Sequence, residues 1–367
     1  MSTKIQHAAV TVTRGKAEMA ALQGVDVWWD TDVISAGRLA PGATIEEWLQ
    51  ASGMTYTFRK AKLHYYADRA QTDLRTDDDN VAIIRSDNGA RMGIANAGYN
   101  ITQPFEMLEF FRDLVAGSGF ELTTAGTLHG GKRMWALAKI TEAKISGWDR
   151  IGAYLLLSSS ADGSLSNEGR LTTVCVVCQN TMGMALAREA KAKVSHRVSM
   201  ALQKLKAELG LETAKEKFAA YVDAASVLST RKVSDAAADE FVLRLLRGAS
   251  ADERVQQAVA AASTGGDTLA ELLAAPFVPK APEQDLESLL RRPRGADAVL
   301  ALFEGAGRGS DQKGRAGTAW GLVNAVTDYV DHVRTCKSDD HRVESAWWGT
   351  GDALKTDAMA MALETFA

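Results

Sequence analysis

Alternating apolar and polar positions dominate the first half of the chain, and turn-forming residues divide them into short runs. A period of two is the pattern of a half-buried β-strand. The three clearest pairs of runs are Val81–Arg85 with Arg91–Ile94, Phe120–Leu128 with Arg133–Ile140, and Gly152–Ser160 with Leu171–Cys178. Only short turns join the two members of each pair, and such connections are typical of antiparallel neighbours. The pattern therefore predicts an antiparallel sheet built from hairpins.

Helical spacing is less common in this half of the chain. Thr44 is placed to cap a short helix that reaches Leu49, and Pro104 opens a helix to about Val115. The apolar positions of the second helix are Phe105, Leu108, Phe111, Leu114 and Val115. Val25–Trp29 has the composition of a short strand, and the acidic stretch Arg69–Asn80 is expected to be a solvated loop.

The character of the chain changes after Gly210, where Ala, Leu and charged residues follow a helical period. Thr318–Val333 and Asp352–Phe366 predict further helices, and five glycines between residues 305 and 317 predict a flexible loop. The whole pattern is that of an α+β fold. The expected divisions are an α+β core domain at 1–209, a helical region at 210–304, a Gly-rich basic linker at 305–317 and a C-terminal helical segment at 318–367.

Composition places the chain among ordinary globular proteins. It has 367 residues, of which 46% are hydrophobic and 24% charged, and its net charge is −4. Three cysteines are too few for a disulfide scaffold, and no apolar run approaches the length of a membrane span. The first residues lack the apolar core of a signal peptide. We therefore expect a soluble cytoplasmic protein without a membrane partner, in which affinity for a polyanion requires local clustering of cations.

The densest cluster of cations lies in Met182–Lys206, which the spacing predicts to be one long helix after the capping side chains Gln179, Asn180 and Thr181. Six cations face the single acid Glu189, namely Arg188, Lys191, Lys193, Arg197, Lys204 and Lys206. One interpretation is a track of phosphate contacts for a nucleic acid. The other is the solvated polar face of an amphipathic helix.

A second candidate surface is the predicted strand Tyr56–Tyr66, which mixes aromatic and basic residues. Alternation places Tyr56, Phe58, Lys60, Lys62 and His64 on one face. Aromatic rings beside cations are typical of a platform for single-stranded nucleic acid. A half-buried edge strand protected by Lys is the alternative. The basic hairpin tip at Lys132 and Arg133 is a further candidate contact.

Motifs for catalysis or metal binding are incomplete. Gly126–Lys132 matches the start of a P-loop, but Arg133 replaces the Ser or Thr that binds Mg²⁺, and a strand pattern follows. Cys175 and Cys178 have C-x₂-C spacing without two further ligands nearby, which favours two buried strand thiols over zinc. No catalytic constellation and no cofactor motif is present, although a nuclease that uses Asp162 and Asn180 remains an alternative.

Several short segments form a recognisable set. They are Ala51–Tyr56, Arg85–Asp87, Ala125–Gly131, Trp135–Ala138, Asp162–Ser164, Val177–Thr181 and Asn324–Thr327, followed by Tyr329, Asp331 and His332. On these segments the chain resembles the phage/plasmid-like proteins of unknown function that mobile elements carry, with Asp162, Gly163, Cys178, Gln179, Asn180 and Thr181 as the motif residues. Ala161 and Cys175 depart from the pattern, where the resemblance implies His and Arg. Element order and charge placement are also similar to the single-strand annealing proteins of phages.

This second similarity implies a non-enzymatic protein that assembles into a ring or filament, binds single-stranded DNA and anneals it during recombination. The expected phosphate contacts are the cations of 182–206, and Tyr56 and Phe58 are the expected stacking partners. The alternative is a protein-interaction module of a mobile element that modulates host machinery. The 211–304 helices and an exposed Trp347-Trp348 pair would suit that role.

Overall fold

The structure is a computed structural model, and it describes residues 18–23, 37–175, 181–183, 191–194, 214–248 and 291–367. Within these residues an eight-stranded sheet has the order β10-β9-β8-β7-β6-β1-β2, and β11 also pairs with β9. Its strands are β1 Glu18–Leu22, β2 Gly37–Leu39, β6 Glu121–Leu128, β7 Arg133–Ile145, β8 Asp149–Ser160, β9 Asn167–Cys175, β10 Thr181–Gly183 and β11 Lys191–Val194. Every pairing except β1 with β2 is antiparallel.

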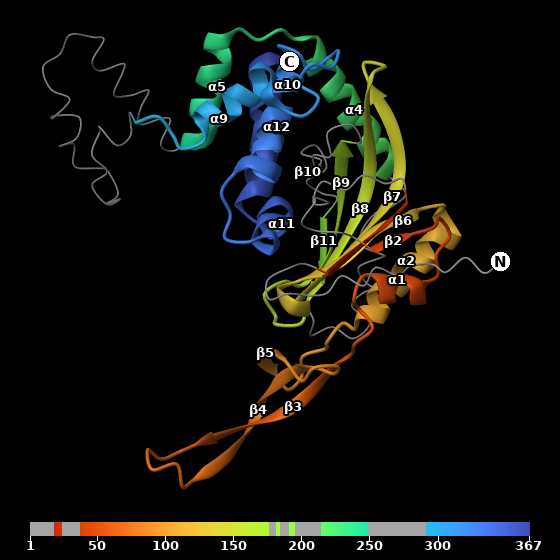
Figure 1. The fold of residues 1–367 in the computed structure, drawn as a ribbon, viewed down its shortest axis with the longest axis vertical. Helices are drawn as coiled ribbons and strands as arrows, with labels where there is room; N and C mark the ends of the chain where they lie inside the picture. The colour runs from red at the N-terminus through yellow and green to blue at the C-terminus, as the bar shows by residue number, and fades with distance from the viewer. Residues whose placement is uncertain (1–17, 24–36, 176–180, 184–190, 195–213, 249–290) are drawn as a thin grey trace, which may run out of the picture.

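A separate three-stranded antiparallel sheet, which we call the arm, consists of β3 Phe58–Tyr66, β4 Leu74–Arg85 and β5 Arg91–Asn96. Figure 1 shows the β3–β4 hairpin of the arm projecting away from the main sheet and from the C-terminal helices. The base of the arm shares the hydrophobic core through Phe58, Ile83 and Met92, all of which are buried. The arm is therefore fixed to the body at one end and surrounded by solvent at the other.

Helices lie beside both edges of the main sheet (Figure 1). The described helices are α1 Ile45–Ala51, α2 Pro104–Ser118, α4 Ala214–Thr230, α5 Asp235–Arg247, α9 Ala296–Ala301, α10 Ala319–Asp328, α11 Asp339–Trp348 and α12 Thr350–Phe366. Short helical turns are η1 His129–Gly131, η4 Leu302–Ala306 and η5 Tyr329–Val333. Helices α1 and α2 contact the β1 and β6 side of the sheet, and α11 and α12 contact β10.

The predicted α+β class and the hairpins are confirmed. Thr44 forms a reciprocal capping box with Glu47, and Thr318 caps α10 by accepting a hydrogen bond from the Gly321 N–H. The helix at Pro104 and the final helix are also present, although Phe105 is exposed and does not join the core.

Two sequence predictions of secondary structure are wrong in the described residues. Leu74–Asn80 belongs to β4 instead of a loop, because β3 offers it backbone partners and the Asp77 carboxylate accepts the N–H groups of Asp79 and Asn80 at an irregularity of the ladder. The predicted helix Met182–Lys206 is strand at Thr181–Gly183 and Lys191–Val194. The edge of β9 pairs with both segments, which outweighs local helix propensity. The rest of 182–206 lies outside the described residues. The predicted strand Val25–Trp29 and the predicted domain boundary at 209 also lie outside them.

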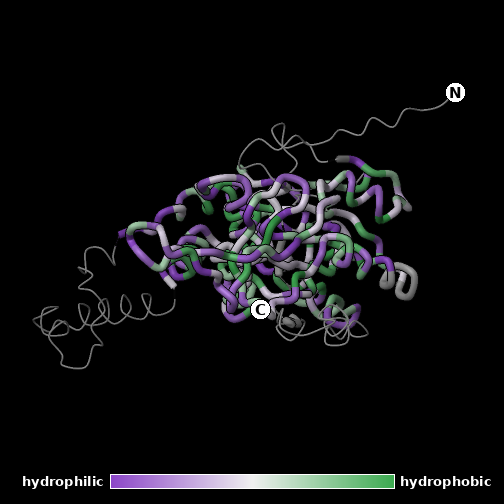
Figure 2. The backbone as a smooth tube through the Cα atoms, turned by 90° about the horizontal axis from the view of Figure 1, so that it is seen from below, coloured by the Kyte–Doolittle hydropathy of each residue, from purple (hydrophilic) through white to green (hydrophobic). Residues whose placement is uncertain are grey.

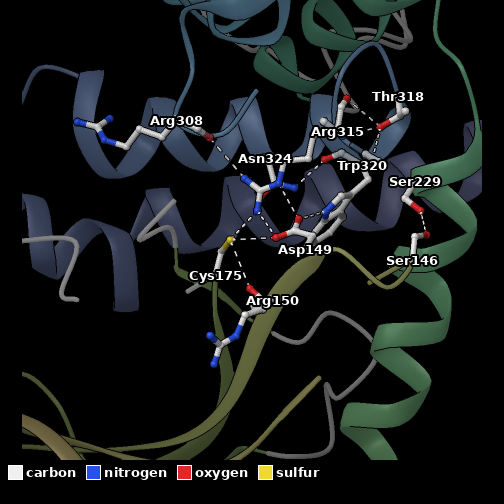
Figure 3. A network of polar contacts seen from close by, with 12 residues as sticks. Ser146, Asp149, Arg150, Cys175, Ser229, Arg308, Arg315, Thr318, Trp320 and Asn324 are labelled. Atoms are coloured by element: carbon white, nitrogen blue, oxygen red, sulfur yellow. Dashed lines mark hydrogen bonds and ion pairs between the residues drawn. The ribbon is translucent and has the colours of Figure 1, made fainter. Parts of the chain in front are cut away.

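The 305–317 stretch also differs from the expected linker. It forms turns that pack on the body, and the Arg315 side chain is 1% exposed. Its guanidinium donates to both oxygens of Asp149, at 2.6 and 2.7 Å, and the Trp320 indole N–H donates to the same carboxylate at 2.8 Å. Cys175 contacts Arg315 and Asp149 in the same network (Figure 3). These contacts join the start of β8 to α10.

The sheets and the C-terminal helices share one hydrophobic core. One cluster of buried apolar side chains runs from the sheets into the C-terminal helices. In the view of Figure 2, hydrophobic stretches gather toward the middle of the described chain and hydrophilic stretches occupy much of its outline. The Asp149–Arg315 ion pair lies inside this arrangement, where an unpaired charge is costly.

We predict that Arg315→Met destabilises the protein by about 3–5 kcal/mol, because it leaves the Asp149 carboxylate buried without its cation. Urea unfolding measures the change. Arg292→Met is the matched control, since Arg292 pairs with Asp239 and Asp297 at the surface. Equal losses in the two variants would contradict the assignment of Arg315 as a structural residue.

Candidate nucleic-acid interface

One face of the arm presents cations and large apolar side chains to solvent. The strand register places Arg59 opposite Ile84, and Ile84 opposite Arg91, so two exposed guanidinium groups flank one aliphatic side chain. Alternation along β3 places Tyr65 on the same face as Arg59, and Tyr65 is 52% exposed. Ile94 on β5 is exposed to the same extent. Within the described residues Arg59 and Arg91 have no ion-pair partner.

The other face of the arm is covered at its base and open toward its tip. Lys62, His64 and Tyr66 follow one another by alternation and are exposed, with Tyr66 at 49%. His64 contacts the Thr76 hydroxyl across the hairpin. Lys60 is also exposed, and its ammonium donates to the Ala97 carbonyl at 2.6 Å. The first face therefore carries its cations, Arg59 and Arg91, near the root of the arm and its ring, Tyr65, near the tip. The second face combines cations with an aromatic ring toward the tip.

The acids of the arm are largely used in local contacts. The Asp68 carboxylate accepts from the Thr72 and Asp73 N–H groups and closes the tip, and these hydrogen bonds lower its pKa. Asp73 pairs with Arg75, and Asp77 holds the irregularity of β4. Asp87 pairs with Arg85 at the root. These acids stabilise turns and do not pair with Arg59, Lys62 or Arg91.

Tyr56 and Phe58 are not stacking partners, which corrects the sequence prediction. Both are buried, at 4% and 5% exposure, and their rings meet edge to face 5.2 Å apart. The Phe58 backbone pairs with the Gln103 side-chain amide, which accepts at 2.8 Å and donates at 3.1 Å. The apolar period of this strand places its first residues in the core, and only the residues nearer the tip reach solvent.

Arg85 anchors the root of the arm. Its guanidinium lies 3.7 Å from the centre of the Tyr56 ring and forms two hydrogen bonds with Asp87, at 2.8 and 2.9 Å. A third hydrogen bond, of 3.0 Å, runs to the Gly130 carbonyl in the β6–β7 turn. The guanidinium holds the pKa of Asp87 below its usual range. A planar cation with several donors can serve all these partners at once, whereas an ammonium cannot.

The motif turn Ala161–Ser164 packs against the arm at β5. A Cβ at Gly93 would lie 2.8 Å from the Asp162 Cα, so β5 and this turn are in close contact. The Tyr99 hydroxyl donates to the Ser160 carbonyl at 3.0 Å. Burial, with the nearby Asp162 carboxylate, raises the pKa of Tyr99. Asp162 itself accepts from the Ser164 N–H, and Gly163 has a φ of +77°. In the described structure these two motif residues shape a turn.

The basic hairpin tip is occupied by internal contacts. Arg133 is 7% exposed and pairs with Glu344 at 2.7 Å, so it is not a solvent-facing phosphate contact. Lys132 beside it is half-buried. The absence of a helix after Gly126–Lys132 is as predicted, because β7 begins at Arg133. Trp347 is buried and Trp348 donates to Ser158, so the Trp pair is not the exposed patch that the sequence suggests.

The remaining predicted contacts are separated from the arm or fall outside the described residues. Lys191 and Lys193 belong to β11, opposite Arg170 and Glu168 of β9. Thr181 begins β10. Arg188, Arg197, Lys204, Cys178, Gln179 and Asn180 lie outside the described residues. Lys60 and Lys62 are therefore the predicted cations that the structure places together on an exposed surface.

Acid–histidine groups elsewhere are committed to packing. Asp328 accepts from the Arg308 guanidinium, and Asp331 accepts from the buried Lys355 ammonium at 2.9 Å. Burial lowers the pKa of His332, which lies between these pairs, to about 4. In the described part of the chain no group of three or more His, Cys, Asp or Glu is placed to hold a metal ion. Cys175 is a buried strand thiol, as the sequence predicts.

Sequence reasoning missed Arg91 and Arg85. Arg91 was visible as the first residue of a predicted strand, but its register with Arg59 requires the hairpin geometry. Arg85 stands two residues before Asp87 at a predicted turn, a spacing that permits a pair. Its burial against Tyr56 depends on tertiary packing.

Comparison with known families shows to which family the chain belongs. A family model described as "Domain of unknown function (DUF932)" matches residues 91–347, which is more than half of the chain. The chain belongs to this family. Characterised proteins and solved structures give no significant match. Among the described helices, none has both the length and the apolarity needed to cross a membrane.

We predict that Gly93→Ala destabilises the protein by about 1–3 kcal/mol, because the new methyl group would overlap the Asp162 backbone. Urea unfolding is the measurement. Gly98→Ala is the control, since its methyl group would meet only the Asn96 side-chain oxygen. An unchanged midpoint for Gly93→Ala would mean that the arm does not rest on the motif turn.

Proposed function

We propose that this protein binds single-stranded nucleic acid, DNA in the first place, along the arm and promotes annealing of complementary strands. The observation that carries the proposal is the pairing of exposed cations with exposed aromatic and aliphatic side chains on a hairpin that projects from the body. Cations bind the phosphates of any sequence, and rings stack with any base.

The row formed by Arg59, Ile84 and Arg91 supports this role. Adjacent strands lie about 4.8 Å apart, so the first and third strands place their cations about 10 Å apart across the sheet. Two guanidinium groups at that separation contact different phosphates of one backbone. Neither guanidinium has an ion-pair partner within the described arm, which leaves both available to a polyanion.

The exposed rings supply the second half of the interface. Tyr65 and Tyr66 stand on opposite faces of β3, and Tyr66 shares its face with Lys62 and His64. Stacking on a tyrosine is worth about 1–3 kcal/mol per base and leaves the hydrogen-bonding edge of the base unoccupied. An edge that stays available can pair with a second strand, which is the requirement for annealing.

The resemblance of the sequence to phage/plasmid-like proteins and to phage annealing proteins motivates this proposal. Assembly of several copies into a ring or filament, acting in recombination in the cytoplasm, completes it. The alternative role as a protein-interaction module loses one of its supports, because Trp347 is buried and Trp348 is engaged by Ser158.

We predict that Arg59→Glu with Arg91→Glu weakens binding of a single-stranded oligonucleotide by at least about tenfold. The magnitude of the salt slope should fall by about 1.4, or about 0.7 for each lost phosphate contact. Fluorescence polarisation at several salt concentrations measures both quantities. The charge-matched control is Lys144→Glu with Lys215→Glu, which alters exposed lysines of β7 and α4.

If the two double variants lose oligonucleotide affinity equally, the loss reflects the overall charge of the protein, and the arm is not the binding surface. Affinity of the unaltered protein that does not respond to salt would overturn the proposal altogether. An RNA oligonucleotide of the same sequence, measured in parallel, tests the preference for DNA.

We further predict that Tyr65→Ala with Tyr66→Ala lowers affinity by at least about fivefold with little change in the salt slope, because stacking releases no counterions. Light scattering with and without the oligonucleotide reports assembly in the same samples. If the unaltered protein and this double variant bind the oligonucleotide with equal affinity, the two tyrosines are not part of the interface.

A further inference from the structure

The turn His129–Gly131 between β6 and β7 is held from two sides. The arm reaches it through Arg85, which donates to the Gly130 carbonyl at 3.0 Å. Helix α11 reaches it through Asp340, whose carboxylate accepts the His129 N–H at 2.8 Å. The turn is thus the point where the arm and the C-terminal helices touch the same three residues.

The backbone of this turn requires outside support. His129 has a φ of +53°, a left-handed conformation that residues with a side chain rarely adopt. Gly130 and Gly131 continue with φ values of +67° and +97°. A Cβ at Gly131 would lie 2.6 Å from the Tyr56 hydroxyl, so the turn also presses directly on the arm root. Any relaxation of His129 changes what Arg85 and Tyr56 contact.

Two carboxylates of α11 supply that support. The Glu344 carboxylate lies 2.8 Å from His129 Nε2 through one oxygen and 2.7 Å from the Arg133 guanidinium through the other. Asp340 is 2% exposed, and its second oxygen has no hydrogen-bond partner among the described residues. Burial raises the pKa of Asp340. The His341 ring completes the surroundings of His129, with its centre 5.2 Å from that of His129.

We propose that the His129–Gly131 turn is a positioning element, through which the docking of α11 sets the orientation of the arm and so its affinity for a single strand. The first half of this proposal concerns the fold, and the second rests on the proposed function. Glu344 is the key residue, because it holds both the strained His129 and the first residue of β7. A ligand or a second copy that displaces α11 would release the arm through the same contacts.

The structure offers a closely matched control for Glu344. Asp352 of α12 pairs with Arg170 of β9 at 2.7 Å, and it too ties a C-terminal helix to the main sheet. The Arg133 and Arg170 side chains have the same exposure, 9%. Glu344→Ala and Asp352→Ala therefore each leave a buried guanidinium without its carboxylate, but only the first loosens the turn.

Hydrogen exchange of the full chain tests the coupling. The reporters are the Arg85 and Ser86 amides at the arm root, which donate to the Ala90 and Thr57 carbonyls. In Glu344→Ala these amides should exchange at least about fivefold faster, the lower end of a typical coupling between sites. In Asp352→Ala they should keep their rate while amides of β9 and α12 exchange faster. Glu344→Gln, which retains hydrogen bonding, should restore most of the protection.

Equal acceleration at the arm root in both alanine variants, or none in Glu344→Ala, would overturn the proposal. Oligonucleotide polarisation on the same proteins separates the two claims. If neither the unaltered protein nor any variant binds the oligonucleotide, but the exchange rates at the arm root differ as predicted, the proposed function is wrong and the coupling between α11 and the arm is supported. If the unaltered protein and Glu344→Ala bind equally well despite altered exchange, the claim that α11 sets the affinity of the arm is wrong.

Discussion

The buried guanidinium of Arg85 is the interaction on which the arm depends. It stacks on Tyr56, pairs with Asp87 and donates to the Gly130 carbonyl, so one side chain joins the hairpin, the strand root and the β6–β7 turn. A buried cation requires that many partners, since leaving any of them unmade would cost more than the contact contributes. The result is a projecting hairpin with a fixed base. A fixed base allows Arg59, Arg91 and Tyr65 to form a surface with a constant geometry.

Local signals were sufficient for the hairpins, for both threonine caps and for the helix-rich second half. Asp87-Asn88-Gly89 and the alternating runs beside it define strand and turn without tertiary information. The same holds for Thr44 with Glu47 and for Thr318, whose side chains complete hydrogen bonds within a few residues. These elements follow from neighbours in sequence, and they determine the fold class.

The errors lie where distant partners decide the outcome. Lys191–Val194 has helix-forming neighbours, yet the edge of β9 makes it a strand. Asp77 looks like a loop residue because its role is to satisfy amides at an irregularity that only pairing with β3 creates. Tyr56 and Phe58 follow the same alternation as the exposed residues. The first part of the strand is nevertheless buried in the core, and only its second part is exposed to solvent. Burial along a strand that leaves the body cannot be read from alternation alone.

The role of the arm is tested most directly by photo-crosslinking a single-stranded oligonucleotide that carries 5-iodouracil, which reacts with aromatic side chains that stack on it. The crosslinked peptide is then mapped by mass spectrometry. We expect attachment within β3, at Tyr65 or Tyr66, and competition by unlabelled single strands. Crosslinks confined to the main sheet or the C-terminal helices, with the arm unmodified, would contradict it.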